Sequence, residues 1–264
     1  MPRGGCSATS AKPPMADAAA EPVTEDRLLG GRLVLRQPAN GFRAAIDPVL
    51  LAAAISAEAG RRVLELGAGT GAAALCLARR VGGVQVAGLD RQQDLVAHAA
   101  ANAALNGLAD RVAFLAGDVR LPPADLLAGS FDHVMANPPY LEAGRATLPP
   151  DPARALAVGE GAADLRVWLD CALRLVRPRG SITVIHRADR LDALLAGLFG
   201  RAGEIVVFPL WPGAGKPAKR VLVRARRGVE TPLRLASGLV LHEADGRFTA
   251  AAEAVLRDGQ ALVL

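Results

Sequence analysis

The chain has 264 residues, 51% hydrophobic and 3% aromatic, with a formal net charge of +5 and a pI near 9.7. This length suffices for one large α/β domain with a sizeable core. Three cysteines without a Cys-x-x-Cys pair argue against a disulfide framework or a zinc site. No apolar run approaches the roughly 18 residues of a membrane span, and a signal-peptide pattern is lacking, so we expect a cytoplasmic protein.

The first 24 residues are rich in Ala, Pro, Ser and Gly without periodicity, which predicts a disordered N-terminal tail (1–24). A short strand or hairpin is expected from about residue 27. The stretch "DPVLLAAAISAE" (47–58) predicts a helix with Asp47 as its N-cap and Pro48 at its first position.

From residue 62 onward, apolar strands and helices alternate along the chain. The expected strands cover residues 62–66, 84–90, 111–118, 131–137, 181–186, 204–210 and 220–227, and the expected helices cover 71–81, 93–107, about 161–176 and 188–199. This alternation predicts an α/β fold with a doubly wound, mostly parallel, seven-stranded sheet. The last two strands are joined by only about ten residues, too few for a helical crossover, so they should be antiparallel neighbours.

Residues 229–264 follow this unit, and we expect them to form a C-terminal extension with a strand, a turn and a short helix, packed on the same domain as residues 25–228. The charge is also uneven along the chain. Residues 201–264 hold ten basic and six acidic side chains, whereas residues 1–200 are nearly balanced. A clustered basic excess fits a polyanionic partner, although ordinary surface arginines would give the same count.

The stretch "ELGAGTGAA" (65–73) is a glycine-rich loop between the first strand of the alternating region and its helix. Gly67, Gly69 and Gly71 permit positive φ and a close approach of a ligand to the backbone. With Ala72 and Asp90, the spacing also satisfies the dinucleotide fingerprint, so a nicotinamide-dependent oxidoreductase remains an alternative.

Three carboxylates favour a different ligand. Glu65 would repel a pyrophosphate but suits a cationic sulfonium and ammonium group, as in S-adenosylmethionine. Asp90 would then bind the ribose hydroxyls, and Asp118 the adenine amino group, because both follow parallel strands at the ligand-binding edge of such sheets.

The tetrapeptide Asn137-Pro138-Pro139-Tyr140 ends the strand expected at 131–137. The Asn137 side-chain oxygen and the Pro138 carbonyl can both accept from one exocyclic amine, which holds its lone pair toward a methyl donor and stabilises developing positive charge. Tyr140 offers a face to a planar base taken out of its stack. The pattern therefore predicts a clamp for a planar amine that needs no general base.

These motifs resemble the amino-group (N6-adenine type) class I methyltransferases and, within them, the bacterial tRNA1(Val) adenine-37 N6-methyltransferase family. The resemblance rests on "ELGAGTG", "GLD", "AGD", "NPPY", "AAIDPVLLAAA" and "KRVLVRARR", and it covers about residues 27–227. It implies S-adenosylmethionine as cofactor, with Asp47 over its methionine end and residues 25–60 over the cofactor site. It also implies an RNA substrate, with tRNA favoured, and no metal.

The exact substrate stays open at this point. Ile46 stands where the family often has threonine, and Leu141 where an aromatic residue is common. The same tetrapeptide serves DNA adenine, rRNA guanine and protein glutamine methyltransferases, and a non-catalytic RNA-binding module is a further alternative. Basic residues in "WPGAGKPAKRVLVRARR" (211–227) favour RNA, with Lys216, Lys219 and Arg220 as candidate phosphate contacts. The oligomeric state, monomer or homodimer, is not predicted.

Overall fold

The computed structural model describes residues 22–40, 43–140 and 164–264. Residues 1–21 of the expected tail therefore lie outside the described residues. A hairpin of β1 (Val23–Leu28) and β2 (Leu33–Pro38), joined by the 3-10 turn η1 (Leu29–Gly31), opens the described chain. Strand β1 starts two residues inside the stretch predicted to be disordered, because its backbone pairs with β2 along its whole length.

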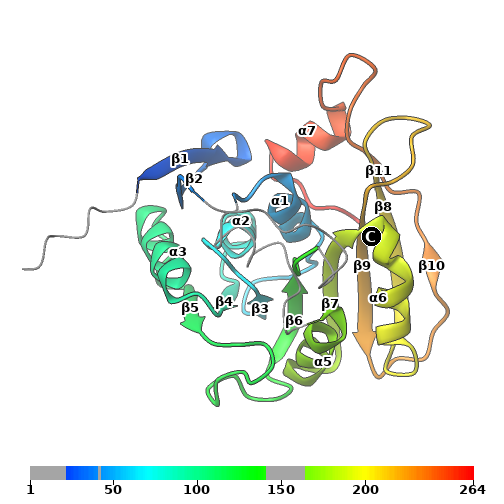
Figure 1. Cartoon of the computed structure of the whole chain (residues 1–264), viewed down its shortest axis with the longest axis horizontal. Helices are drawn as coiled ribbons and strands as arrows, with labels where there is room; N and C mark the ends of the chain where they lie inside the picture. The colour runs from blue at the N-terminus through cyan, green and yellow to red at the C-terminus, as the bar shows by residue number, and fades with distance from the viewer. Residues whose placement is uncertain (1–21, 41–42, 141–163) are drawn as a thin grey trace, which may run out of the picture.

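One large sheet forms the centre of the molecule (Figure 1). Its strands lie in the order β10 (Arg234–Leu235), β8 (Ala202–Trp211), β9 (Arg220–Arg227), β7 (Val176–Arg187), β6 (Phe131–Ala136), β3 (Arg62–Leu66), β4 (Gln85–Asp90) and β5 (Val112–Ala116), with β11 (Leu239–Val240) also paired to β8. Strands β3 to β8 are parallel, whereas β9 is antiparallel to both of its neighbours. The predicted mostly parallel sheet with one antiparallel strand is confirmed, but it has nine strands and not seven, because β10 and β11 of the C-terminal extension add to the predicted set β3–β9.

Helices cover both faces of this sheet. The described helices are α1 (Ile46–Ala53), α2 (Ala72–Arg80), α3 (Gln93–Leu105), α5 (Leu165–Leu175), the short turn η2 (Ala188–Arg190), α6 (Leu191–Leu198) and α7 (Ala250–Leu256). Successive strand residues point to opposite faces, so Val63 packs in the core under α1 and α2, and Leu64 in the core under α5 and α6. The part of the helix predicted from residue 161 that precedes residue 164 lies outside the described residues.

Helix α1 differs from its prediction at both ends. It begins at Ile46 after Ala45, so Asp47 is its second residue and not its N-cap, and Pro48 is its third. The Asp47 carboxylate bonds to side chains of other elements instead. The helix ends at Ala53, and the Arg80 guanidinium and the backbone N–H of Leu262 satisfy carbonyl oxygens at this end.

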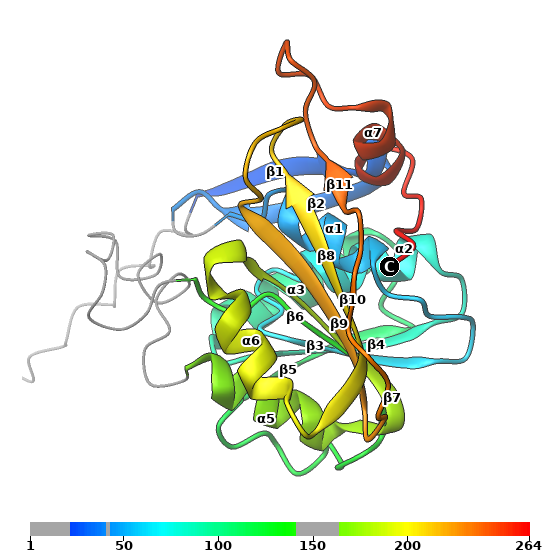
Figure 2. The same cartoon turned by 90° about the vertical axis from the view of Figure 1, so that its right-hand side faces the viewer.

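The C-terminal extension packs on the same body. Strands β10 and β11 add to the edge strand β8, and α7, capped by the Thr249 hydroxyl, lies against α1. Leu262 and Leu264 are buried in the core that holds the β1–β2 hairpin. The extension thus covers a sheet edge and holds the N-terminal hairpin and α1 against the sheet (Figure 2).

Candidate functional site

The glycine-rich loop joins the carboxyl end of β3 to α2, and its three glycines all have positive φ. A side chain at Gly67 would collide with the Trp168 ring at 2.7 Å, and one at Gly71 with the Phe114 ring at 2.7 Å. A side chain at Gly69 would meet no atom of the described protein within 4 Å. Protein packing therefore demands glycine at two of the positions, while the third borders open space where a ligand can approach.

Glu65 lies beneath this loop and is only 3% exposed. Its Oε2 accepts the backbone N–H of Ala74 at 2.8 Å, in the first turn of α2. Burial raises the pKa of Glu65 to about 8, so at neutral pH the carboxyl is mostly protonated unless a cation approaches. The sequence predicted Glu65 as a cofactor ligand but did not predict its hydrogen bond with the backbone of Ala74.

Asp90 ends β4, beside β3, and its carboxylate supports the loop directly. Its Oδ2 accepts the backbone N–H of Gly69 at 2.8 Å, and its Oδ1 that of Gln92 at 2.9 Å. Desolvation raises the pKa of Asp90, as expected for a carboxylate buried at a strand end. Asp90 and Glu65 are thus brought to one edge of the sheet, as predicted.

Asp118 follows β5, the next strand of the sheet, but it has a strong partner of its own. Both of its oxygens accept from the Arg120 guanidinium, the shortest distance being 2.7 Å, and this hydrogen bonding lowers the pKa of Asp118. A ligand amino group at Asp118 would therefore share the carboxylate with Arg120, which the sequence motif did not reveal.

The Asn-Pro-Pro-Tyr tetrapeptide follows β6 and gathers side chains from three other elements. Tyr140 Oη lies 2.8 Å from Asp47 Oδ2 of α1 and 2.5 Å from Asn137 Oδ1. Arg220, the first residue of β9, donates from Nε to the same Asp47 oxygen at 3.0 Å. Its Cζ lies 4.6 Å from the centre of the Tyr140 ring, a cation–π contact.

His186, in β7, lies fully buried next to the tetrapeptide. Its Nε2 is 3.3 Å from the carbonyl oxygen of Pro139, and its ring meets that of Tyr140 edge-on, with centroids 5.5 Å apart. Burial lowers the pKa of His186 to about 4, so the ring is neutral and packs as a structural residue. No described residue donates to the carbonyl oxygen of Pro138, which belongs to a buried residue.

The predicted phosphate contacts divide into two kinds. Lys216 and Lys219 are exposed on the loop between β8 and β9, and neither forms an ion pair with a described residue. Because β8 is parallel to β6 and β7, this loop lies at the same sheet edge as Asn137 (Figure 2). Arg220, in contrast, is engaged with Asp47 and Tyr140, so it belongs to the site itself.

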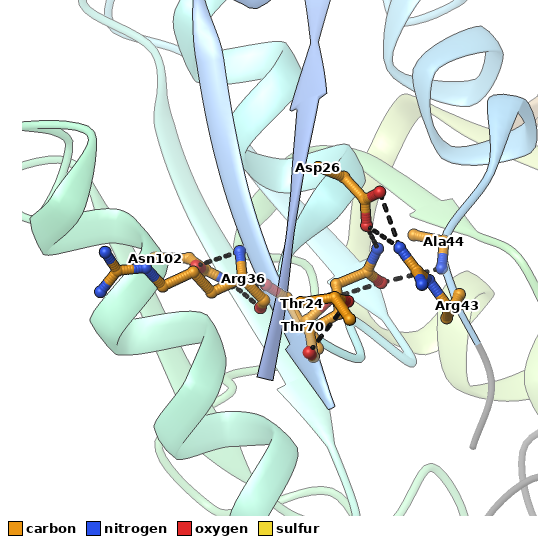
Figure 3. A network of polar contacts seen from close by, with 8 residues as sticks. Thr24, Asp26, Arg36, Arg43, Ala44, Thr70 and Asn102 are labelled. Carbon is orange, nitrogen blue, oxygen red and sulfur yellow. Dashed lines mark hydrogen bonds and ion pairs between the residues drawn. The ribbon is translucent and has the colours of Figure 1, made fainter. Parts of the chain in front are cut away.

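A polar network that the motifs did not predict ties the N-terminal hairpin to the glycine-rich loop (Figure 3). Asn102 of α3 is buried, and its amide exchanges hydrogen bonds with the backbone of Arg36 in β2. The same amide donates to the carbonyl oxygen of Thr70 in the loop at 3.0 Å. The Thr70 hydroxyl lies 3.4 Å from Gln37 Oε1, and Gln37 in turn binds Asp26. The sequence signal was weak: two asparagines, at 102 and 106, on one face of an alanine-rich helix.

Two kinds of feature are absent from the described part of the chain. No group of three or more His, Cys, Asp or Glu side chains is placed to hold a metal ion there. In those same ranges, no helix is long and apolar enough to cross a bilayer.

The strand order, with one antiparallel strand inserted between the last two parallel ones, and the glycine-rich loop at the carboxyl edge define a class I S-adenosylmethionine-dependent methyltransferase. A family model described as a methyltransferase domain matches residues 57–198. The chain is 31% identical over 206 residues to the tRNA1(Val) (adenine(37)-N6)-methyltransferase of Aeromonas hydrophila, covering 77% of this chain and 84% of that protein. The chain belongs to the family of these methyltransferases.

The chain is also similar to methyltransferases with other names. The release factor glutamine methyltransferase of Deinococcus radiodurans is 39% identical over 177 residues, which cover 63% of this chain and 58% of that protein. A crystal structure of a predicted O-methyltransferase, Atu636 of Agrobacterium tumefaciens, superposes with a TM-score of 0.69 at 25% identity and covers 82% and 98% of the two chains. The predicted enzyme class, N-methyltransferase with S-adenosylmethionine as cofactor, is confirmed, and the oxidoreductase alternative is set aside.

Proposed function

We propose that this enzyme methylates N6 of an adenine in a tRNA, with adenine 37 of a valine tRNA as the first substrate to test. The observation that carries the proposal is the Asn137–Tyr140 cluster at the end of β6, next to the glycine-rich loop of the adjacent strand β3. The relatives matched over most of their length bear this activity in their names.

The residues at the carboxyl edge fit S-adenosylmethionine. Space free of described protein atoms borders Gly69, and the buried Asp90 fixes the backbone there. We propose that Asp90 binds the ribose hydroxyls and that Asp118, shared with Arg120, receives the adenine amino group. When the sulfonium cation approaches and lowers the pKa of Glu65, its carboxylate provides negative charge near the methionine end, and Gly67 and Gly71 shape the loop.

The bound cofactor supplies an electrophilic methyl group on a sulfonium. The chain's own residues orient the target. The Asn137 side-chain oxygen and the carbonyl oxygen of Pro138 accept the two hydrogens of the amine, which directs its lone pair outward. Both acceptors stabilise the positive charge that develops on nitrogen, so they act more strongly in the transition state than on the substrate. The proton then leaves to solvent after transfer. Pro139 is held by His186, which keeps the backbone rigid.

We propose the RNA-binding surface from the positions of exposed, positively charged side chains. Lys216 and Lys219 lie exposed and unpaired with any described carboxylate at the edge where the target base must enter. Residues 229–264 contain three basic and five acidic side chains, so the basic excess of the C-terminal region belongs to the β8–β9 region and not to the extension. Phosphate contacts of this kind supply most of the non-specific affinity for RNA.

A protein glutamine substrate is the second candidate. The 39% identity to a release factor glutamine methyltransferase over 177 residues exceeds the 31% identity to the tRNA methyltransferase over 206 residues. A glutamine amide and an adenine amine present the same planar –NH₂ to the clamp.

Incubation with isotope-labelled S-adenosylmethionine and, in parallel, unmodified tRNA, rRNA, DNA and protein extract separates the two candidates. Each substrate is then digested to monomers, and the labelled product is identified by mass spectrometry. N6-methyladenosine from tRNA supports the proposal. Label confined to methylglutamine would move the substrate to a protein, and label confined to rRNA or DNA would move it to another nucleic acid.

A further inference from the structure

One phenolic hydrogen stands between two acceptors in the site. Tyr140 Oη is 2.8 Å from Asp47 Oδ2 and 2.5 Å from Asn137 Oδ1. A phenol carries one hydrogen and can donate it to only one of them at a time. The acceptor that takes it decides whether the Asn137 oxygen is occupied by Tyr140 or left to another donor.

Asp47 is the better acceptor of the two. A hydrogen bond to an ionised carboxylate is roughly twice as strong as one to a neutral amide. Arg220 donates to the same Asp47 oxygen at 3.0 Å and places its guanidinium over the Tyr140 ring, so a positive charge holds both residues in place. The Asp47 and Arg220 side chains are 18% and 32% exposed, which limits competition from water.

We propose that Asp47 and Arg220 are positioning residues that take the Tyr140 hydrogen away from Asn137 and thereby keep the Asn137 amide oxygen available to the target amine. With its hydrogen on Asp47, the phenol oxygen becomes an acceptor. A half-turn of the Asn137 amide would then let its –NH₂ donate to Tyr140 and would free its carbonyl oxygen from that contact. The inference rests on the proposed role of Asn137 as acceptor for an amine.

The charged and titratable groups that face Tyr140 agree with this arrangement. They come from three elements: Asp47 from α1, Arg220 from β9 and His186 from β7. Burial raises the pKa of Tyr140 above its usual value, and the Asp47 charge raises it further, whereas Arg220 opposes the shift. The phenol is therefore a hydrogen donor throughout the neutral range.

A double-mutant cycle between Asp47 and Tyr140 tests the proposal, with kcat and KM measured on the methyl acceptor. In Asp47→Ala, the phenol turns its hydrogen to Asn137, and kcat at saturating cofactor should fall about tenfold, the worth of one hydrogen bond. Tyr140→Phe keeps the ring but removes the competing hydroxyl. In that background, Asp47→Ala should change kcat by less than about twofold, because the two residues act through one hydrogen. Asp47→Asn, which keeps the side-chain shape, should lower kcat less than Asp47→Ala does.

A second readout does not depend on the substrate. Tyr140 is the one tyrosine in the sequence, so the ultraviolet absorbance of the phenolate reports this residue alone in an alkaline titration. Asp47→Ala should move the midpoint down toward the usual tyrosine value, and Arg220→Met should not lower it. Asp170→Ala and Arg226→Met are matched controls that remove the same charges from an α5 ion pair and from elsewhere on β9, and both should leave the midpoint unchanged.

Equal losses from Asp47→Ala in the wild-type and Tyr140→Phe backgrounds would overturn the proposal, since Asp47 would then act without the hydroxyl. A titration midpoint unmoved by Asp47→Ala would overturn it as well. A wild-type enzyme that methylates no RNA would contradict the proposed function alone, because the titration, and the same cycle on a glutamine substrate, still test the positioning role.

Discussion

The side-chain amide of Asn102 links helix α3 to the glycine-rich loop, donating to the carbonyl oxygen of Thr70 at 3.0 Å and to that of Arg36 at 2.9 Å. Asn106, one turn later, makes the corresponding pair of bonds to the backbone of Val34 but does not reach the loop. Two asparagines therefore complete the free edge of β2 in the manner of a neighbouring strand, and one of them also fixes the loop that should bind the cofactor (Figure 3).

This pair gives a matched comparison. We expect Asn102→Ala and Asn106→Ala to lower the free energy of unfolding by similar amounts, about 1–3 kcal/mol each, because each leaves backbone groups of β2 unpaired. Only Asn102→Ala should weaken S-adenosylmethionine binding, since only Asn102 contacts Thr70. Chemical denaturation and calorimetric titration measure the two effects. Equal cofactor affinity in both variants would show that the Thr70 contact is structural only.

Replacement of Asn137 tests the amine clamp. Asn137→Ala should reduce kcat by about 10²–10³-fold, the usual cost of removing one group that stabilises transition-state charge. Cofactor affinity should survive, because the one hydrogen bond described for the Asn137 side chain goes to Tyr140 and not to the glycine-rich loop. Single-turnover methyl transfer and cofactor titration on the same preparation separate the two quantities. Turnover equal to that of the wild type would refute the role assigned to this residue.

The exposed lysines of the β8–β9 loop should bind RNA phosphates. We expect Lys216→Glu with Lys219→Glu to weaken tRNA binding about tenfold or more and to reduce the dependence of log K on log salt by about 2. Cofactor affinity should not change. Arg220 is left out of this variant, because its reversal would break the contacts with Asp47 and Tyr140.

The control for the lysine variant carries the same charge change at the opposite sheet edge. Arg174 and Arg179 are exposed near the amino ends of the strands. Arg174→Glu with Arg179→Glu should leave the salt dependence of tRNA binding near that of the wild type. A filter-binding series over several salt concentrations measures both proteins, and equal losses in the two variants would place the RNA elsewhere.

Glu65 should make cofactor binding depend on pH. Its pKa is raised to about 8 in the free protein, and a sulfonium cation near it would lower that value, so binding releases a proton. Affinity should therefore rise with pH between about 6 and 8, by at most about tenfold per unit, and level off above about 8. Glu65→Gln, which can still accept from Ala74, should remove this component.

Calorimetric titration of both proteins at several pH values checks the Glu65 prediction, and the difference between them cancels ionisations of the ligand itself. S-adenosylhomocysteine, which lacks the sulfonium charge, should show a smaller difference. Parallel pH profiles for the wild type and Glu65→Gln would mean that the carboxyl only supports the start of α2.

Much of the architecture could be predicted because it is encoded locally. The alternation of apolar strands and helices and the short connection between β8 and β9 both depend on neighbouring residues. The carboxylates at the strand ends could also be foreseen, because parallel strands bring their carboxyl ends to one edge. Glu65 and Asp90 meet the glycine-rich loop there, as expected.

The sequence by itself determined the order of elements, the glycine-rich loop and the Asn-Pro-Pro-Tyr tetrapeptide, since each is a pattern of a few adjacent residues. Only the tertiary structure decided the partners of Asp47, which the sequence pattern placed at a helix cap. It brings α1, the tetrapeptide and β9 together across 93 and 173 residues of chain, from Asp47 to Tyr140 and to Arg220. The physical reason is that a side chain's partner is set by which surfaces pack together. A long, charged Arg220 looks the same in sequence whether it faces solvent, a phosphate or a half-buried carboxylate.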